Sequence, residues 1–153
     1  MRVLVTGVEN PTGKAIVESL ADAGHQVRAF GLAPGTNPFQ SRANVEPFAG
    51  DAALGGSLEP VAAECQAVVH AANLDRAATA VTIESGTRYA RFAAERELVE
   101  QLIVLMPVGN RSLAKGIASA ETHIRAARVP HTLLAAETPE AAAAEVAHIL
   151  STR

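Results

Sequence analysis

The segment TGVENPTG, Thr6 to Gly13, is the stretch of the chain with the clearest potential for chemistry. Gly7 and Gly13 frame a turn between an apolar run and a helix-like segment. Such turns hold phosphates, because backbone N–H groups and the positive end of the helix dipole point toward the anion. Asn10 stands where a middle glycine is expected, and we expect it to tolerate the left-handed backbone. Pro11 removes one N–H donor. The segment therefore predicts a weakened anion-binding turn, and the alternative is a sharp turn without a ligand.

Two other uses of small polar residues are excluded by their spacing. A Walker A loop has four residues between its glycines and Ser or Thr after its lysine. Here five residues separate the glycines, and Ala15 follows Lys14. Ser85 and Ser112 lack the G-x-S-x-G context of a hydrolase nucleophile. Neither nucleoside triphosphate binding of the Walker type nor serine hydrolysis is indicated.

The five histidines and the single cysteine do not form a metal motif. The histidines are scattered, no H-x-x-x-H or H-E-x-x-H pair occurs, and we expect no metal site. His70 stands near the end of an apolar run, where it would either contact a ligand or form a hydrogen bond in the core. Cys65 has no cation beside it in the sequence, which predicts a buried, inert thiol.

Apolar runs of strand type alternate with segments of helical periodicity along the whole chain. The predicted strands are residues 2–7, 25–32, 45–51, 66–73, 102–109 and 130–137, and the predicted helices are residues 12–24, 57–65, 85–101, 113–129 and 138–153. Strands that are almost entirely apolar and alternate with helices form parallel sheets covered on both faces. We therefore expect an α/β fold, a three-layer doubly wound (Rossmann) parallel sheet of about six strands in a single domain, residues 1–153.

Three residues are expected to end or begin helices. Gly24 stands just after the first helix, where a left-handed cap is favoured. Ser57 and Thr138 are predicted N-caps, and Pro139 suits the first position of the last helix. In a doubly wound sheet the ligand lies outside the carboxyl ends of the strands, beside the first strand. The turn at the start of the first helix is therefore the predicted site.

Composition and charge exclude several other classes of protein. The net charge is −3 and no run of Lys or Arg is present, so no nucleic-acid partner is expected. The apolar run at the amino terminus is too short for a signal peptide, and no segment approaches the ~18 apolar residues of a membrane span. We expect no membrane partner and a cytoplasmic location.

The order of these landmarks resembles the atypical and extended short-chain dehydrogenase/reductase proteins, in particular their NmrA-like and NAD-dependent epimerase-like branches. RVLVTGVENPTGKAIVESLADAGHQVRAF is similar to their opening unit, and AGD (residues 49–51) is similar to the Gly-Asp after the third strand. AVVHAAN resembles their fourth strand, SGTRYARFAAEREL a core helix, and SAETHIRAARVPHTLL a late helix and strand. The resemblance covers almost the whole chain.

The resemblance implies NAD or NADP as the cofactor, without indicating which one. At the end of the second strand, Gly31 and Leu32 offer neither an acid for the ribose of NAD nor a base for the phosphate of NADP. Arg42 could reach a phosphate, but a solvated loop arginine is the preferred interpretation. The residues expected to bind the cofactor are Gly7, Asn10, Pro11, Thr12, Gly13, Gly31, Asp51, Ala71 and Ala72.

The reductase pair Tyr-x-x-x-Lys of this family has no counterpart in the sequence. Such a pair needs i, i+4 spacing to place an acid/base tyrosine and its lysine on one helix face. Tyr89, the one tyrosine, has Ala93 four residues later, and the late helix places Leu113 and Ile117 at the matching positions. Met106-Pro107 replaces the Ser or Thr that usually ends the fifth strand.

Three functions remain open. The first is an NAD(P)-binding protein without Tyr/Lys chemistry, which would act as a cofactor sensor or as a subunit. The second is an oxidoreductase or an epimerase/isomerase with a rebuilt site, in which His70, Asn73 or Lys115 would move the proton. The third is a ligand-free dimerisation scaffold. The chain ends about fifteen residues after its last strand, so we expect no separate substrate domain and a possible homodimer.

Overall fold

The computed structural model describes residues 1–135 and 137–152. Within them a parallel sheet of six strands has the order β3-β2-β1-β4-β5-β6. The strands are β1 (Arg2–Thr6), β2 (Gln26–Leu32), β3 (Val45–Ala49), β4 (Ala67–His70), β5 (Gln101–Met106) and β6 (His131–Ala135). The strand order reverses between β1 and β4, which makes this the switch point of a doubly wound fold. The predicted fold is confirmed.

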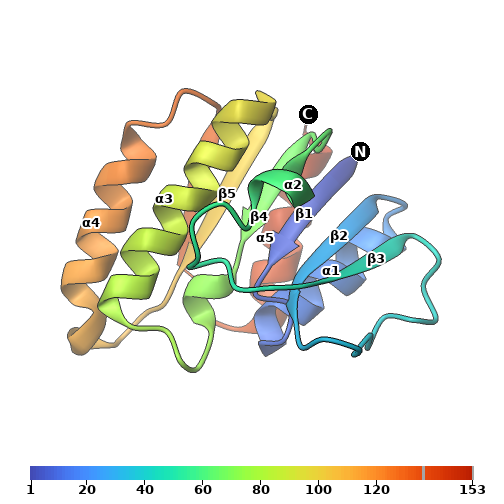
Figure 1. Cartoon of the computed structure of the whole chain (residues 1–153), viewed down its shortest axis with the longest axis horizontal. Coiled ribbons are helices and arrows are strands. Elements are labelled where there is room, and N and C mark those ends of the chain that lie inside the picture. Colours follow the sequence, from blue (N-terminus) through green and yellow to red (C-terminus); the bar gives the residue numbers. More distant parts are fainter. Residues whose placement is uncertain (136, 153) are drawn as a thin grey trace.

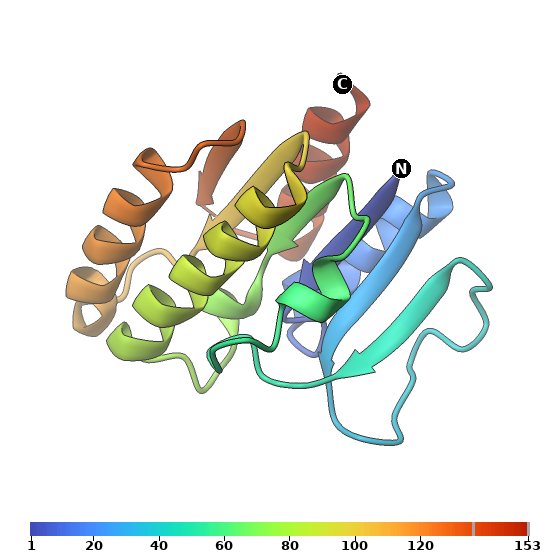
Figure 2. The same cartoon turned by 45° about the horizontal axis from the view of Figure 1, so that its top comes forward.

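Helices cover both faces of the sheet, as Figures 1 and 2 show. They are α1 (Pro11–Asp22), α2 (Glu59–Ala62), α3 (Ala80–Glu97), α4 (Ala114–Arg125) and α5 (Pro139–Ser151), with short 3₁₀ turns η1 (Ala72–Leu74) and η2 (Arg111–Leu113). α1 and α5 pack on the face that carries Val3 and Val5, whereas α2, α3 and α4 pack on the face of Leu4.

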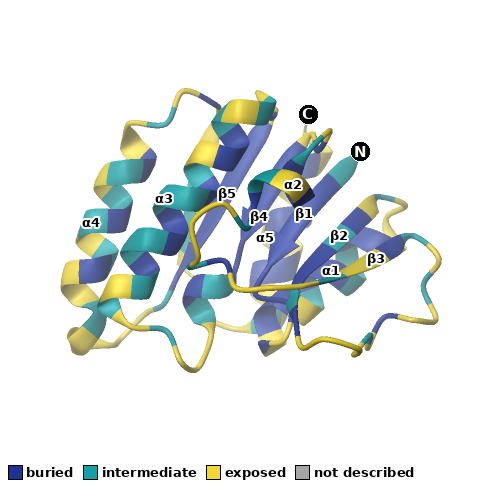
Figure 3. Ribbon diagram, viewed as in Figure 1, coloured by how far each residue is buried: buried dark blue, intermediate teal, exposed yellow. Residues whose placement is uncertain are grey.

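The central strands are buried on both faces because each face has its own helical layer. Every residue of β4 and β5 is buried, and so are Val3 to Thr6 of β1 (Figure 3). The edge strands β3 and β6 are more exposed. This pattern explains why the central strands read as continuous apolar runs in the sequence.

Two of the predicted helix caps are confirmed. Gly24 follows α1 with φ +90°, the left-handed conformation that glycine adopts at little cost. The side chain of Thr138 accepts a hydrogen bond from Ala141 N, and Pro139 is the first residue of α5. Residue 136 of the predicted last strand and residue 153 of the predicted last helix lie outside the described residues.

The predicted N-cap at Ser57 is wrong. α2 is a single turn, its N-cap position is Leu58, and no side chain caps it. The Ser57 hydroxyl instead donates to Asp51 O (2.8 Å) and Leu54 O (2.7 Å), so it stabilises the loop that leads into the helix. A short hydroxyl side chain can donate to nearby turn carbonyls as readily as it can accept from the N–H groups of a helix terminus.

α3 begins five residues before its predicted start at residue 85 and ends before residue 101. Thr79 forms a capping box with Thr82, and each side chain accepts a hydrogen bond from the other residue's backbone N–H. Leu98, with φ +50°, ends the helix, and Gln101 already belongs to β5. The Thr-Thr pair replaces the Glu or Gln that usually marks such a box in a sequence.

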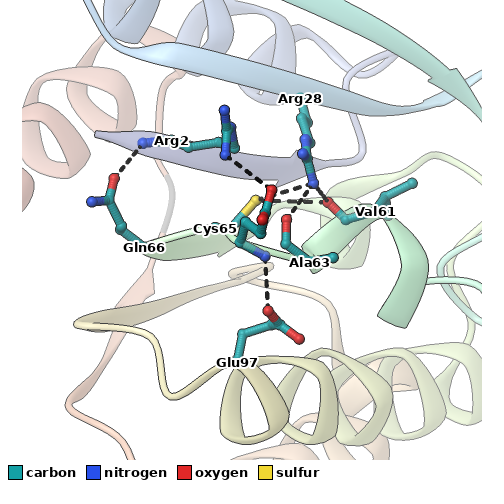
Figure 4. Close-up of polar contacts among 8 residues, drawn as sticks. Arg2, Arg28, Val61, Ala63, Cys65, Gln66 and Glu97 are labelled. Carbon is teal, nitrogen blue, oxygen red and sulfur yellow. Dashed lines mark hydrogen bonds and ion pairs between the residues drawn. The ribbon is translucent and has the colours of Figure 1, made fainter.

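A cluster of polar contacts ties the strands together near their amino ends (Figure 4). The Arg28 guanidinium donates to Val61 O (2.9 Å) and Ala63 O (2.6 Å), and it lies 3.9 Å from Cys65 Sγ. Cys65 is buried, as predicted. Burial raises the pKa of the Cys65 thiol, while Arg28 acts in the opposite direction. The cluster joins β2 to the segment between α2 and β4.

No helix within residues 1–135 and 137–152 is both long and apolar enough to cross a membrane.

Candidate functional site

Two concave features lie at the carboxyl ends of the strands, where the switch-point rule places a ligand. A cavity of about 260 Å³ is bounded by residues at or just beyond the ends of β1, β2, β3 and β4, among them Gly7, Gly31, Asp51 and Ala72. A second hollow of about 320 Å³ reaches toward the end of β5 and is lined by Thr12 and Leu113. The two hollows share Asn73, Asp75 and Ala78 in their walls, so they adjoin each other.

Close backbone packing explains both glycines of the turn after β1. Gly7 has φ +71°, and a Cβ there would lie 2.5 Å from Ala72 N at the end of β4. A Cβ on Gly13 would lie 2.1 Å from Gly7 O. These separations are far below van der Waals contact, so any side chain would force helix and strands apart. The turn therefore needs both glycines whether or not a ligand is bound.

Asn10 does not take the left-handed backbone that we expected. Its φ and ψ are −78° and 155°, and it is the N-cap of α1. Asn10 Oδ1 accepts a hydrogen bond from Gly13 N (2.8 Å), which satisfies a helix N–H that a phosphate could otherwise use. Pro11 is the first helical residue, as predicted, and has no N–H. Few donors therefore remain at this helix terminus.

The amide nitrogen of Asn10 ties the turn to the segment after β4. Asn10 Nδ2 donates to Ala71 O (3.0 Å) and to Asp75 Oδ1 (2.7 Å). Asn10 is buried, whereas Asp75 is partly exposed at the rim of the cavity. We call these contacts the Asn10–Asp75 bridge. Asn10 thus uses both ends of its amide within the protein.

Three carboxylates surround the turn. Burial raises the pKa of Asp75, the Asn10 hydrogen bond acts in the opposite direction, and the negative charges of Glu9 and Asp51 raise it further. Glu9 Oε1 accepts a hydrogen bond from Ala33 N (2.7 Å), just beyond β2. No Lys or Arg is present among the described residues that line the 260 Å³ cavity. The charged side chains in the lining of this cavity, Asp51 and Asp75, are therefore all acidic.

His70, the last residue of β4, forms part of the cavity wall and is fully buried. Its Nδ1 lies 2.8 Å from Thr6 Oγ1, which accepts a hydrogen bond from Ala72 N (3.2 Å). Burial lowers the pKa of His70 to about 4, and an interaction with Asn73 acts in the opposite direction. The ring is therefore neutral at pH 7. His70 is thus a buried histidine that forms a hydrogen bond in the core, and it also lines the cavity.

His70 Nε2 has no hydrogen-bond partner among the described residues. A Cβ on Gly86, another residue of the cavity wall, would lie 3.3 Å from this atom. Asn73 is also buried beside the cavity, but its Nδ2 donates to Thr87 Oγ1 (3.0 Å) and Leu105 O (3.2 Å). The glycine on α3 therefore keeps open the space in front of the His70 ring.

The structure brings together only part of the residue set predicted from the sequence. Gly7, Gly31, Asp51, Ala72, His70 and Asn73 line one cavity, and Thr12 lines the adjoining hollow. Asn10, Gly13 and Ala71 are buried parts of the turn or of its support, Pro11 is exposed at the start of α1, and none of the four lines either hollow. Their roles toward a cofactor stay predictions.

Two cations considered in the sequence lie elsewhere. Lys115 is exposed on α4 and does not line either hollow, so the structure does not bring it to His70. Arg42 forms an ion pair with Asp22 at the carboxyl end of α1, on the opposite edge of the sheet from the cavity. A surface role for Arg42 agrees with the preferred interpretation.

The positions of the missing reductase pair are apolar in the structure as well. Leu113 lines the second hollow, and Ile117 packs partly buried against the core beneath α4. Tyr89 packs beside Gly55 and under the Arg88 guanidinium, 5.4 Å from the ring centre, and lines neither hollow. Glu9 and Asp75 were not predicted as site residues, although Glu9 lies within the glycine turn and Asp75 stands two residues after AVVHAAN.

The strand order, together with the cavity beside the glycine turn at the switch point, defines a Rossmann fold of the dinucleotide-binding class. Residues 3–107 match the sequence model of the NAD dependent epimerase/dehydratase family. The chain therefore belongs to this family, and the resemblance to epimerase-like short-chain dehydrogenase/reductase proteins is confirmed. No match was found among curated proteins.

Solved structures share the fold at low sequence identity. The oxidoreductase ylbE from Lactococcus lactis is 16% identical with a TM-score of 0.81, over 99% of this chain and 85% of that one. The Bordetella bronchiseptica enzyme WbmH, in complex with NAD+, is 16% identical with a TM-score of 0.74, over 88% of this chain. A short-chain dehydrogenase/reductase superfamily protein from Agrobacterium tumefaciens, with bound NAD, is 22% identical with a TM-score of 0.69, also over 88% of this chain.

The chain spans 55% of the length of WbmH and 48% of that of the Agrobacterium protein. At these identities the likeness establishes the fold.

Proposed function

We propose that this chain is an NAD(P)-binding domain of the epimerase/dehydratase family that does not use Tyr/Lys reductase chemistry. The observation that carries the proposal is the convergence of Gly7, Gly31, Asp51 and Ala72 on one cavity at the switch point. These residues come from four different strand ends, and all four are among those that the sequence predicts to bind the cofactor. The cavity volume, about 260 Å³, suits one half of a dinucleotide better than a whole one.

The bound cofactor would supply hydride chemistry, while this chain would contribute binding and orientation. Asp51 would accept hydrogen bonds from hydroxyl or amino groups of the adenosine half. Gly7 and Gly31 would let the ligand approach the backbone closely. Leu113 and Ile117, which stand at the positions of the reductase pair, carry no group that can exchange a proton, so standard Tyr/Lys reductase turnover is not expected.

Calorimetric titration with NAD, NADH, NADP and NADPH tests this function. We expect binding of at least one of these ligands at or below millimolar concentration, and a loss of about tenfold or more in Asp51→Ala. Lys115→Ala is the matched control, because Lys115 is exposed and lines neither hollow. Absence of binding by all four cofactors would contradict the proposal.

A second candidate, an oxidoreductase or isomerase with a rebuilt site, is favoured by one observation. His70, Asn73 and Asp75 line the same cavity, and the pKa of Asp75 is raised by its partial burial. A carboxyl group with a raised pKa can serve as a general acid or base. Turnover of a nucleotide-sugar or hydroxy-acid substrate that is lost in Asp75→Asn, with NAD binding intact, would support this candidate.

We also propose that residues 1–153 act as one cofactor-binding unit in the cytoplasm and that two copies associate. A substrate site would then be completed by the second copy or by another protein. Sedimentation at micromolar concentration, with and without NAD, measures the association. A monomer under both conditions would contradict the homodimer.

A further inference from the structure

The cavity presents a hydrogen-bond donor that the protein itself does not use. The hydroxyl of Thr6 is buried, and its Oγ1 accepts from Ala72 N. His70 Nδ1 is the one acceptor for the Thr6 hydroxyl hydrogen among the described contacts. This assignment places the ring hydrogen of neutral His70 on Nε2, the atom without a partner. A buried N–H without an acceptor destabilises the fold, and a ligand acceptor in the cavity would remove that cost.

The opposite side of the cavity presents acceptors. Asp51 is exposed at the rim, and one of its carboxylate oxygens accepts a hydrogen bond from Ala53 N (2.9 Å). Phe30 and Gly50 also line the cavity, and the Phe30 ring packs so closely that a Cβ on Gly50 would lie 2.5 Å from it. A planar ring with amino donors and ring-nitrogen acceptors, on a sugar with hydroxyl groups, fits this distribution of donors and acceptors.

The adjoining helix terminus is unsuitable for a diphosphate. Gly13 N is already bonded to Asn10 Oδ1, and Pro11 has no N–H to offer. The Asn10–Asp75 bridge holds one carboxylate beside the turn, and Glu9 places a second at the end of β2. A diphosphate would therefore meet two like charges and few backbone donors there, against one cation among the described lining residues of the adjoining hollow, Arg76.

We propose that this site recognises an uncharged purine nucleoside and gains little or no affinity from an attached diphosphate. The inference rests on the proposed nucleotide site and specifies which half of the cofactor carries the binding energy. The same acidic surroundings disfavour the additional phosphate of NADP, because the described lining of the cavity supplies no cation to pair with it.

Calorimetry with adenosine, ADP, NAD and NADP tests the inference directly. We expect Kd values for adenosine and NAD within tenfold of each other, with ADP no tighter than adenosine and NADP weaker than NAD. NAD binding tenfold or more tightly than adenosine would overturn the inference and leave the proposed function intact. Binding of adenosine without any binding of NAD or NADP would support the inference and contradict the proposed function. Absence of binding by all four ligands would contradict both.

The variant Asp75→Asn removes the negative charge at the Asn10–Asp75 bridge while keeping the shape of the side chain. It keeps an oxygen for Asn10 Nδ2 and removes the negative charge, so NAD and ADP should bind about fivefold more tightly at low salt while adenosine binding is unchanged. Asp22→Asn, which removes an exposed carboxylate on the opposite edge of the sheet, should change none of these values. An equal effect of Asp75→Asn on adenosine and NAD, or no effect on either, would overturn the electrostatic basis of the inference.

Discussion

Asn10 and Asp75 are 65 positions apart in the chain, yet Asn10 Nδ2 donates a 2.7 Å hydrogen bond to Asp75 Oδ1. The same side chain caps α1 through Gly13 N and reaches Ala71 O. One residue at the middle position of the glycine turn therefore joins the first helix to the end of β4. A glycine there could make none of these contacts.

Asn10→Ala should reduce the free energy of unfolding by about 2 kcal/mol, because it removes a helix cap and leaves Ala71 O and Asp75 without their amide donor. Thr138→Ala removes a cap with one hydrogen bond, to Ala141 N, and should cost about 1 kcal/mol. Urea unfolding monitored by circular dichroism measures both. A cost for Asn10→Ala no greater than that for Thr138→Ala would show that the Asn10–Asp75 bridge adds no stability.

The stability should fall as the pH falls from about 6.5 to about 4. The pKa of His70 is lowered from 6.5 to about 4 by burial, so within this window the unfolded chain binds more protons than the folded one. The difference corresponds to about 3 kcal/mol lost by pH 4. Urea unfolding at several pH values between 4 and 7 measures the slope.

His70→Gln is the control for this slope, because glutamine does not titrate. His25, whose pKa is lowered by burial and by the Met1 ammonium group, contributes in the same direction, and Asp75, whose pKa is raised, contributes in the opposite one. The slope that disappears in His70→Gln is therefore the part that belongs to His70. An unchanged slope would show that His70 is not held neutral in the fold.

Gly13→Ala should destabilise the fold by about 3 kcal/mol or more, because its Cβ would lie 2.1 Å from Gly7 O. Gly24→Ala is the comparison. Gly24 has φ +90° and no heavy atom within 4 Å of the added Cβ, so the cost is the backbone strain of about 1 kcal/mol. Thermal and urea unfolding rank the two variants. Equal costs would mean that the close approach of α1 to the turn relaxes easily.

Arg28→Ala should cost about 2 kcal/mol, because it leaves the carbonyls of Val61 and Ala63 without their charged donor. Arg42→Ala removes a more solvent-exposed ion pair with Asp22 and should cost less than about 1 kcal/mol. The comparison uses unfolding in urea at 0.1 M and 0.5 M salt. The Arg28 contacts are those drawn in Figure 4.

Cys65 should react with a disulfide reagent at least about 100-fold more slowly in the folded protein than in urea. The thiol is buried, and burial raises its pKa, so little reactive thiolate is present at pH 7. The absorbance of the thiolate released from Ellman's reagent follows the reaction over time. Fast reaction without denaturant would indicate that the segment before β4 opens readily.

Much of the fold was predictable because its determinants are local. Strands such as β4 and β5 are covered on both faces, so they read as unbroken apolar runs whatever the details of packing. The start of α3 was not predictable, since Thr82 takes the place of the usual Glu or Gln in the capping box. Ser57 was misassigned because a hydroxyl bonds turn carbonyls as well as helix N–H groups.

The candidate site was predictable in position and only partly in chemistry. The switch-point rule placed Gly7, Gly31, Asp51 and Ala72 together, since strand ends meet at one edge. The role of Asn10 was misjudged because its backbone preference is local, whereas its hydrogen-bond partners Ala71 and Asp75 come from a distant segment. The unused nitrogen of His70 likewise depends on Thr6 and Gly86, which no sequence pattern connects.

The tight contacts of Gly7 and Gly13 bear on how glycine fingerprints evolve. A side chain at either position would collide with backbone atoms of the protein itself, so selection for folding preserves both glycines even in a lineage that no longer binds a dinucleotide. The middle position accommodates a side chain, because Asn10 fits there as the N-cap of α1. Within this turn, the two glycines are therefore required by the architecture, and their presence alone does not indicate a bound dinucleotide.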